Sequence, residues 1–303
     1  MGEIAVNPVF NVHKKYREMN LVNPYVYSQS VAPVLDLYSG AKVAFSLRKL
    51  RTAYTGKCLR VRRSSDNTEL DIDFKSNGKL DDTALLSFVG GGNGYVVKWY
   101  DQSGNALDAY QTVNANQPRI VLSGVIETQN GDNSIRLDQT LSHFMRVGLF
   151  SFTNASVFSC GYYLAGDVNS RFFAMSPVGS IDYGGSDSRR FSFSTRSILS
   201  AFRAISTGSP TGDVLINNYS SQILTSTYAE YYRRGVLIGS DYAITPSLCT
   251  APSINIGLTG DFPATGFERD YMNGYLKELM FYDSDQSANR LSIEANISDF
   301  YGI

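Results

Sequence analysis

The feature that most constrains the fold is a strand followed by a tight turn at residues 95–111. The run Y-V-V-K-W-Y at 95–100 is apolar, favours β-structure and holds the only tryptophan, Trp99. It breaks at once into D-Q-S-G-N, which is typical of a turn. We expect the Asp101 carboxylate to accept a hydrogen bond from the backbone two residues on, and Gly104 to take a positive φ. The functional alternative is a carboxylate held at a strand end to touch a ligand.

The composition predicts an all-β protein. The chain has 20 Tyr, 17 Phe and 26 Gly, whereas runs of helix-forming residues are scarce. Apolar segments recur about every ten residues with short turns between them, which is typical of a sandwich or jelly roll. We expect one domain over residues 36–303, with Trp99 inside it, a short Asp-capped helix at 81–89 and another helix from about Ser287.

Charge and cysteine usage exclude several classes of function. Lys plus Arg number 27 against 28 Asp plus Glu, so no net field favours nucleic acid or a membrane surface. No apolar run is long enough to span a membrane. The three cysteines and two histidines follow no metal-binding spacing, so we expect no metal and no cofactor. The first residues do not form a signal peptide, which predicts synthesis in a reducing cytoplasm.

Residues 1–34 differ from the rest of the chain in composition and pattern, and we predict that they form an N-terminal arm. They hold a basic cluster at 13–17 and apolar residues without a period of 2 or 3.6. One interpretation is a disordered leader. The other is an arm that orders on a partner or a second copy of the chain, because its aromatic content is unlike that of a solvated tail. The predicted anchoring residues are Phe10, Val12, Tyr25 and Tyr27.

Three arginines lie in the alternating strand at 58–63. Arg60, Arg62 and Arg63 could form an anion site or a solvated face. The alternation of apolar and basic residues favours the solvated face.

Two linked motifs resemble a known family. The stretch T-A-Y-T-G-K-C-L-R-V-R-R-S-S-D at 52–66 precedes V-K-W-Y-D-Q-S-G-N at 97–105. This order is similar to the catalytic β-sandwich of fungal-type α-L-arabinofuranosidases, and to lectin-like domains of tailed-phage virion proteins, including those of crAss-like phages. The segment N-G-Y-L-K-E-L at 273–279, with a short helix and a final Y-G-I, resembles the close of concanavalin A-like lectin folds. The resemblance implies a concanavalin A-like jelly-roll β-sandwich with an extended N-terminal arm.

The function predicted from the sequence is structural. A glycosidase needs two carboxylates across a sugar cleft, and no glutamate of this chain can be matched to the catalytic positions of the arabinofuranosidases. Their cysteine-rich, disulfide-bonded segments are also missing, and no signal peptide is seen. We therefore predict a non-enzymatic virion protein, a head or tail fibre or decoration component, with no catalytic residue. The alternative is a glycoside hydrolase of the α-L-arabinofuranosidase type.

Four residues are candidates for contact with carbohydrate, because tyrosines stack on sugars and also form hydrogen bonds. They are Asp182, Tyr183, Tyr228 and Tyr231. The alternative for each tyrosine is an ordinary place in the sandwich. The predicted partners are capsid or tail proteins, further copies of the chain and a surface glycan, and the predicted location is the virion. The sequence leaves a structural calcium open.

Overall fold

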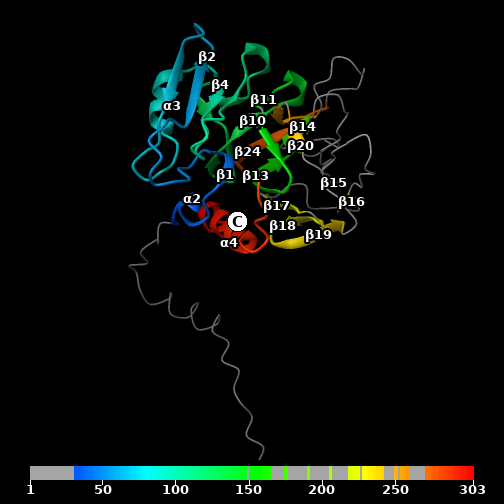
Figure 1. The fold of residues 1–303 in the computed structure, drawn as a ribbon. Coiled ribbons are helices and arrows are strands. Elements are labelled where there is room, and N and C mark those ends of the chain that lie inside the picture. The colour runs from blue at the N-terminus through cyan, green and yellow to red at the C-terminus, as the bar shows by residue number, and fades with distance from the viewer. Residues whose placement is uncertain are drawn as a thin grey trace, which may run out of the picture. The chain divides into compact units, whose positions relative to one another are not determined.

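The fold is taken from a computed structural model (Figure 1). It describes residues 31–148, 150–164, 173–176, 190–191, 205–206, 218–225, 227–241, 249–251, 253–259 and 270–303. The compact unit is Ala32–Ile303. It opens with the short helix α2, Val34–Leu37, whose first two residues are buried. The predicted anchoring residues Phe10, Val12, Tyr25 and Tyr27 lie outside the described residues.

The prediction of an all-β sandwich is confirmed. Every strand pair that the structure describes is antiparallel, and the main sheet forms two blocks. In one block β24 (Gly274–Tyr282) pairs with β1 (Ala41–Ser46), β10 (Ile135–Leu137) and β13 (Ala155–Tyr163). This block continues through three further strands, β17 Asn218–Leu224, β18 Ala229–Arg233 and β19 Val236–Asp241.

The second block begins with β2 (Leu59–Arg63) between β3 (Glu69–Ile72) and β4 (Gly94–Trp99). Strand β4 leads on to four strands, β5 Ala109–Tyr110, β11 Met145–Val147, β21 Ser253–Ile256 and β14 Phe173–Ser176. Strand β6, Arg119–Leu122, pairs with both β4 and β10 and so joins the two blocks.

The remaining elements are small. They are β7 Val125–Ile126, β8 Thr128–Gln129, β9 Asp132–Asn133, β12 Phe150–Phe152, β15 Arg190–Phe191, β16 Ile205–Ser206, β20 Cys249–Ala251, β22 Leu258–Thr259, β23 Asp270–Tyr271, and the 3-10 turns η1 Asn114–Asn116 and η2 Gln139–Leu141. Helix α3, Asp82–Val89, has its predicted cap, because Asp81 accepts a hydrogen bond from the Ala84 N–H at 3.0 Å.

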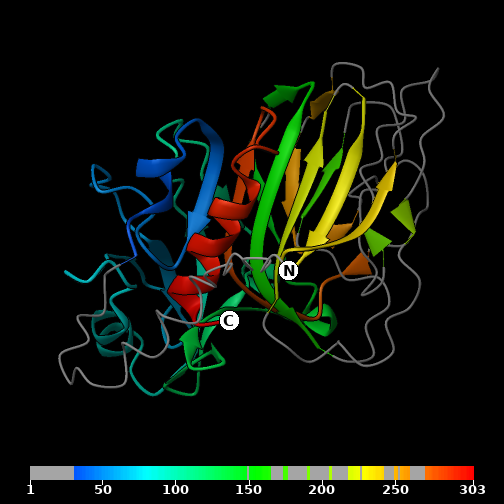
Figure 2. The same cartoon turned by 90° about the horizontal axis from the view of Figure 1, so that it is seen from below.

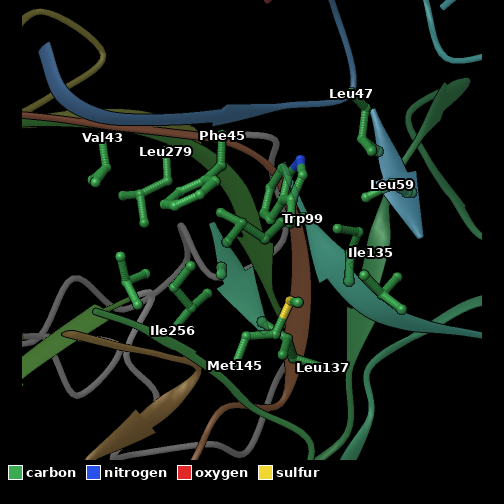
Figure 3. Close-up of a cluster of buried hydrophobic side chains, with 14 of the residues drawn as sticks. Val43, Phe45, Leu47, Leu59, Trp99, Ile135, Leu137, Met145, Ile256 and Leu279 are labelled. Carbon is green, nitrogen blue, oxygen red and sulfur yellow. The ribbon is translucent and has the colours of Figure 1, made fainter. Parts of the chain in front are cut away.

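The core lies between the two blocks (Figure 3). Trp99 is fully buried there, as predicted, and its ring centroid lies 5.7 Å from that of Phe45 in β1. Val43 and Leu279 approach from the first block, and Met145 approaches from the second. Alternate residues of each strand fill this space, so the residues between them point to the outer face.

Helix α4, Arg290–Tyr301, covers part of the outer face of the first block. Figure 2 shows it in red, lying across the sheet between β1 and β13. Ile293 and Ile297 are fully buried against Phe158 of β13 and Met280 of β24. The spacing of four residues places the two isoleucines on one side of the helix, which explains why this side packs on the sheet.

Strand β24 contains a bulge where it pairs with β13. Cys160 pairs with Glu278 and Gly161 pairs with Leu276, so Lys277 is the extra residue. Leu276 and Leu279 both belong to the core. Lys277 and Glu278 therefore both leave the core side, and both are fully buried.

Candidate functional site

The turn after β4 is held by the carboxylate of Asp101. Its Oδ1 accepts hydrogen bonds from the backbone N–H groups of Ala44 and Ser103, each at 2.9 Å. Its Oδ2 accepts from the Ser103 hydroxyl at 2.7 Å and from the Leu107 N–H at 3.1 Å. Asp101 is 4% exposed, and Gly104 has a φ of 101°. Both predictions for this turn are confirmed, and the four contacts occupy Asp101 within the fold.

Gln102 ties the same turn to β1 and to the segment after it. Its side-chain oxygen accepts from the Leu50 N–H at 2.7 Å, and its amide nitrogen donates to the carbonyls of Ser46 and Arg48 at 3.1 and 3.0 Å. The D-Q-S-G sequence is thus a structural device that fixes where β4 ends and where β5 begins.

The fixed register aligns polar side chains in a row across the second block, which we call the Tyr110 row. Each member is the cross-strand partner of the next, from β3 to β21: Asp71, Arg60, Lys98, Tyr110, Arg146 and Asn255. Their chain neighbours Leu59, Trp99, Ala109, Met145 and Ile256 belong to the core. The row therefore lies on the outer face of the sheet.

One end of the Tyr110 row is an ionic network. Arg60 donates to both carboxylate oxygens of Asp71, with Nε–Oδ1 at 2.7 Å and Nη2–Oδ2 at 3.0 Å. The Tyr100 hydroxyl donates to the same Oδ1 at 2.7 Å, and Lys98 pairs with Asp108 at 3.0 Å. The hydrogen bond from Arg60 lowers the pKa of Asp71. Burial and the contact with Asp71 raise the pKa of Tyr100 to about 12.

The middle of the row is accessible. Tyr110 is 44% exposed and lies between Lys98 and Arg146. The Arg146 guanidinium lies 5.3 Å from the centroid of the Phe144 ring. Beyond it, Asn255 is only 1% exposed and its Oδ1 has no hydrogen-bond partner among the described residues. An exposed aromatic ring flanked by donors suits a flat polyhydroxyl ligand such as a sugar.

The predicted carbohydrate contacts fall elsewhere. Tyr231 is 8% exposed and packs in the core, while Tyr228 is half-buried against the cluster beneath α4. Asp182 and Tyr183 lie outside the described residues. Carbohydrate binding by these four residues stays a prediction. Tyr110 was not among the predicted contacts, although it lies in the stretch at 95–111 from which the fold was predicted.

His143 is buried and hydrogen-bonded within the fold. Burial lowers its pKa to about 4, and its Nδ1 accepts a hydrogen bond from the Asp138 N–H at 3.3 Å. Among the described residues, no three His, Cys, Asp or Glu side chains come together in a group that could hold a metal ion. Those residues also include no helix that is long and apolar enough to cross a membrane.

Comparison with known proteins finds a similarity to an enzyme family over the motif region. Residues 26–133 match the family model described as "Alpha-L-arabinofuranosidase B, catalytic". This stretch is roughly a third of the chain and includes β2, β4 and β5. A search of curated protein sequences finds no match.

Solved structures extend the likeness to most of the chain. A GH54 α-L-arabinofuranosidase soaked with a cyclic sulfate inhibitor has 13% sequence identity and a TM-score of 0.59. An arabinofuranosidase complexed with arabinofuranosyl-α-1,2-xylobiose has 15% identity and a TM-score of 0.56. In both cases the likeness covers 89% of this chain and 65% of the other, so the chain spans less than two thirds of these proteins. The shared fold is a β-rich sandwich.

These findings correct the expected function. The prediction of a non-enzymatic virion fibre or decoration protein is wrong, because the matched family and the similar structures are glycoside hydrolases and show no link to a phage. Missing cysteines and a missing signal peptide do not exclude a hydrolase, because neither feature bears on the catalytic groups. The predicted partners, self-association and location stay untested.

Proposed function

We propose that this chain is a glycoside hydrolase of the α-L-arabinofuranosidase type. The observation that carries the proposal is the match of residues 26–133 to the catalytic domain of arabinofuranosidase B. That stretch contains Asp101 and Gln102, which set the register of β4 and β5, and it supplies four of the six residues of the Tyr110 row.

The Tyr110 row supports a role in holding the sugar. A pyranose or furanose ring can lie on the exposed face of Tyr110, where the aromatic ring replaces water against the C–H groups of the sugar. Lys98 and Arg146 on either side can donate to sugar hydroxyls. Few polar groups at fixed positions are enough to orient such a ligand.

The chemistry requires two carboxyl groups with different pKa values. Asp71 suits the ionised partner, because Arg60 and Tyr100 both stabilise its charged form. Asp66, Asp82 and Asp138 also have lowered pKa values. None of these four suits the general acid, which needs a raised pKa.

The test is hydrolysis of 4-nitrophenyl α-L-arabinofuranoside, the compound soaked into a mutant of one of the similar GH54 enzymes. We expect release of 4-nitrophenol by the full chain. Tyr110→Ala is expected to raise KM by about tenfold, the loss of roughly 1.4 kcal/mol of stacking. Tyr54→Ala, a tyrosine outside the row, serves as the matched control.

A series of carboxylate-to-amide variants then locates the catalytic pair. It covers Asp71 in the row, Asp108 as the partner of Lys98, and Asp182, Asp261 and Glu268 outside the described residues. Loss of a general acid or base is expected to lower kcat by about 10²- to 10⁴-fold. The proposal fails if the chain shows no turnover of this substrate or of other aryl glycosides, or if turnover survives every amide variant.

A further inference from the structure

A second row of side chains crosses the outer face beside the Tyr110 row, and we call it the arginine row. Its members are successive cross-strand partners on β2, β4, β6, β10, β24 and β13: Arg62, Tyr95, Arg119, Arg136, Tyr275 and Tyr162. Their chain neighbours Val61, Val96, Ile120, Ile135 and Leu276 belong to the core. The arginine row therefore faces away from the core, as the Tyr110 row does. The strands that carry it are labelled in Figure 1, except β6.

The arginine row carries more positive charge than the carboxylates in contact with it can neutralise. Arg119 pairs with Glu127, with Nε–Oε1 at 2.6 Å, and Arg136 lies 3.3 Å from Asp138. Arg119 and Arg136 are direct cross-strand partners, an arrangement of like charges that destabilises a sheet. The row thus has three arginines, and carboxylates pair with only two of them.

Arg62 is the arginine that no carboxylate contacts among the described residues. Its three hydrogen bonds go to neutral oxygens: Gln117 Oε1 at 2.7 Å, Asn67 Oδ1 at 2.7 Å and the Asn114 carbonyl at 3.3 Å. Its cross-strand partner Glu69 is exposed at the edge of the block.

The prediction of a solvated face at 58–63 is wrong for Arg62, because its side chain is buried, with only 7% exposed. Burial lowers its pKa. A buried cation with neutral partners costs stability, and a bound anion would offset that cost.

Arg119 offers the contact that such an anion needs. Its side chain is 14% exposed, and within the described residues only Nε makes a hydrogen bond, so neither terminal NH₂ group has a partner there. A carboxylate binds two N–H groups of one guanidinium in this way. Tyrosine rings flank the arginines: the Arg62 guanidinium lies 4.9 Å from the Tyr95 centroid, and that of Arg136 lies 5.3 Å from the Tyr275 centroid.

We propose that the arginine row binds the carboxylate of a uronic-acid residue in the glycan that the Tyr110 row holds. This deepens the proposed hydrolase function and rests on it. The two rows share β2 and β4, where Arg60 and Arg62 are two residues apart, about 6.6 Å along a strand. That distance is comparable to one sugar unit, so neighbouring units of a single branched chain can reach both rows. Arg119 contacts the carboxylate, while the tyrosines pack on the ring that carries it.

The test is calorimetric binding of two probes to the full chain: a xylo-oligosaccharide bearing glucuronic acid, and the same oligosaccharide after reduction of its carboxyl group. We expect the acidic probe to bind about tenfold or more tightly, and the preference to shrink as salt rises. Arg119→Gln should abolish the preference. Arg119→Lys, which keeps the charge and the pairing with Glu127 but loses the fork, should reduce it. Arg63→Gln is the matched control, because Arg63 is paired with Asp66 outside the row.

Equal binding of the two probes overturns the inference, and so does an unchanged preference in Arg119→Lys. Inorganic phosphate that competes as strongly as the acidic probe would reduce the row to a general anion site and also overturns it. Hydrolysis of 4-nitrophenyl α-L-arabinofuranoside is measured in the same preparations. Turnover without a preference for the acidic probe contradicts this inference alone, whereas binding without turnover contradicts the proposed hydrolysis.

Discussion

Two buried carboxylates, Asp101 after β4 and Glu278 in β24, are satisfied in opposite ways. Asp101 accepts only from neutral donors, three backbone N–H groups and one hydroxyl. Glu278 binds the Arg48 guanidinium through both oxygens, at 2.7 and 2.9 Å, and also accepts from Ser46 and Tyr301 at 2.8 and 3.2 Å. One carboxylate organises a turn, and the other neutralises a buried cation.

The two sites also differ in how far along the chain their partners lie. Two of the three partners of Asp101, Ser103 and Leu107, are two and six residues away, and Ala44 is 57 residues away. Arg48 and Ser46 are 230 and 232 residues from Glu278. The comparison shows that a nearby network can be inferred from a short motif, whereas an ionic network of this kind exists only once the whole domain has folded. Four experiments test the contrast.

Glu278→Gln should have the largest effect. It leaves the fully buried Arg48 guanidinium without a countercharge, and removing one partner of a buried ion pair costs about 3–5 kcal/mol. The free energy of unfolding from urea denaturation measures this loss. A cost below that of Asp101→Asn would contradict the assignment of Glu278 as the partner that Arg48 needs.

Asp101→Asn should cost less, about 2–3 kcal/mol. The amide oxygen can still accept from Ala44 and Ser103, but the NH₂ group then faces the Leu107 N–H, which loses its acceptor. The same denaturation experiment gives the value. The two networks would be energetically alike if both amide variants lost equal stability, and the contrast drawn here would then fail.

The two serines that donate to these carboxylates give a matched pair. Ser46→Ala is expected to cost about 1.5 kcal/mol and Ser103→Ala about 1 kcal/mol, because Ser46 is fully buried beside a charged pair and Ser103 is partly exposed. Thermal unfolding of the two variants in parallel resolves the order. The reverse order would show that burial does not set the strength of these hydrogen bonds.

The double variant Arg48→Met/Glu278→Leu should have the smallest effect, roughly within 1 kcal/mol of the wild-type stability. Replacing a buried ion pair with apolar side chains removes the cost of desolvating both charges. The double-mutant cycle with the two single variants reports the coupling energy. Additive losses would mean that Arg48 and Glu278 act independently.

The same contrast explains what the sequence could predict. The D-Q-S-G turn and the cap of α3 depend mainly on residues close together in the chain, and both are confirmed. The burial of Arg62 could not be predicted from its alternating strand. It depends on Asn114 and Gln117, more than 50 residues away, which fold over its guanidinium.

The candidate site could not be predicted from the sequence, for a similar reason. Tyr110 and Arg146 are neighbours only because β5 pairs with β11, and no local pattern specifies that register. Residues of β18 alternate between the two faces of the sheet, but the sequence does not show which of its tyrosines face the core. Tyr231, a predicted sugar contact, is 8% exposed and faces the core.

The pairing of β1 with β24 has a consequence for how the chain is made. Residues 41–46 find their partners at 278–282, so the first strand of the sandwich leaves the ribosome long before its neighbour exists. Until then its edge is open to pairing with other chains. Slow folding, as expected for such non-local strand pairing, lengthens this exposure. Growth temperature and chaperone supply should therefore govern the yield of intact protein more strongly than the stability of the finished domain does.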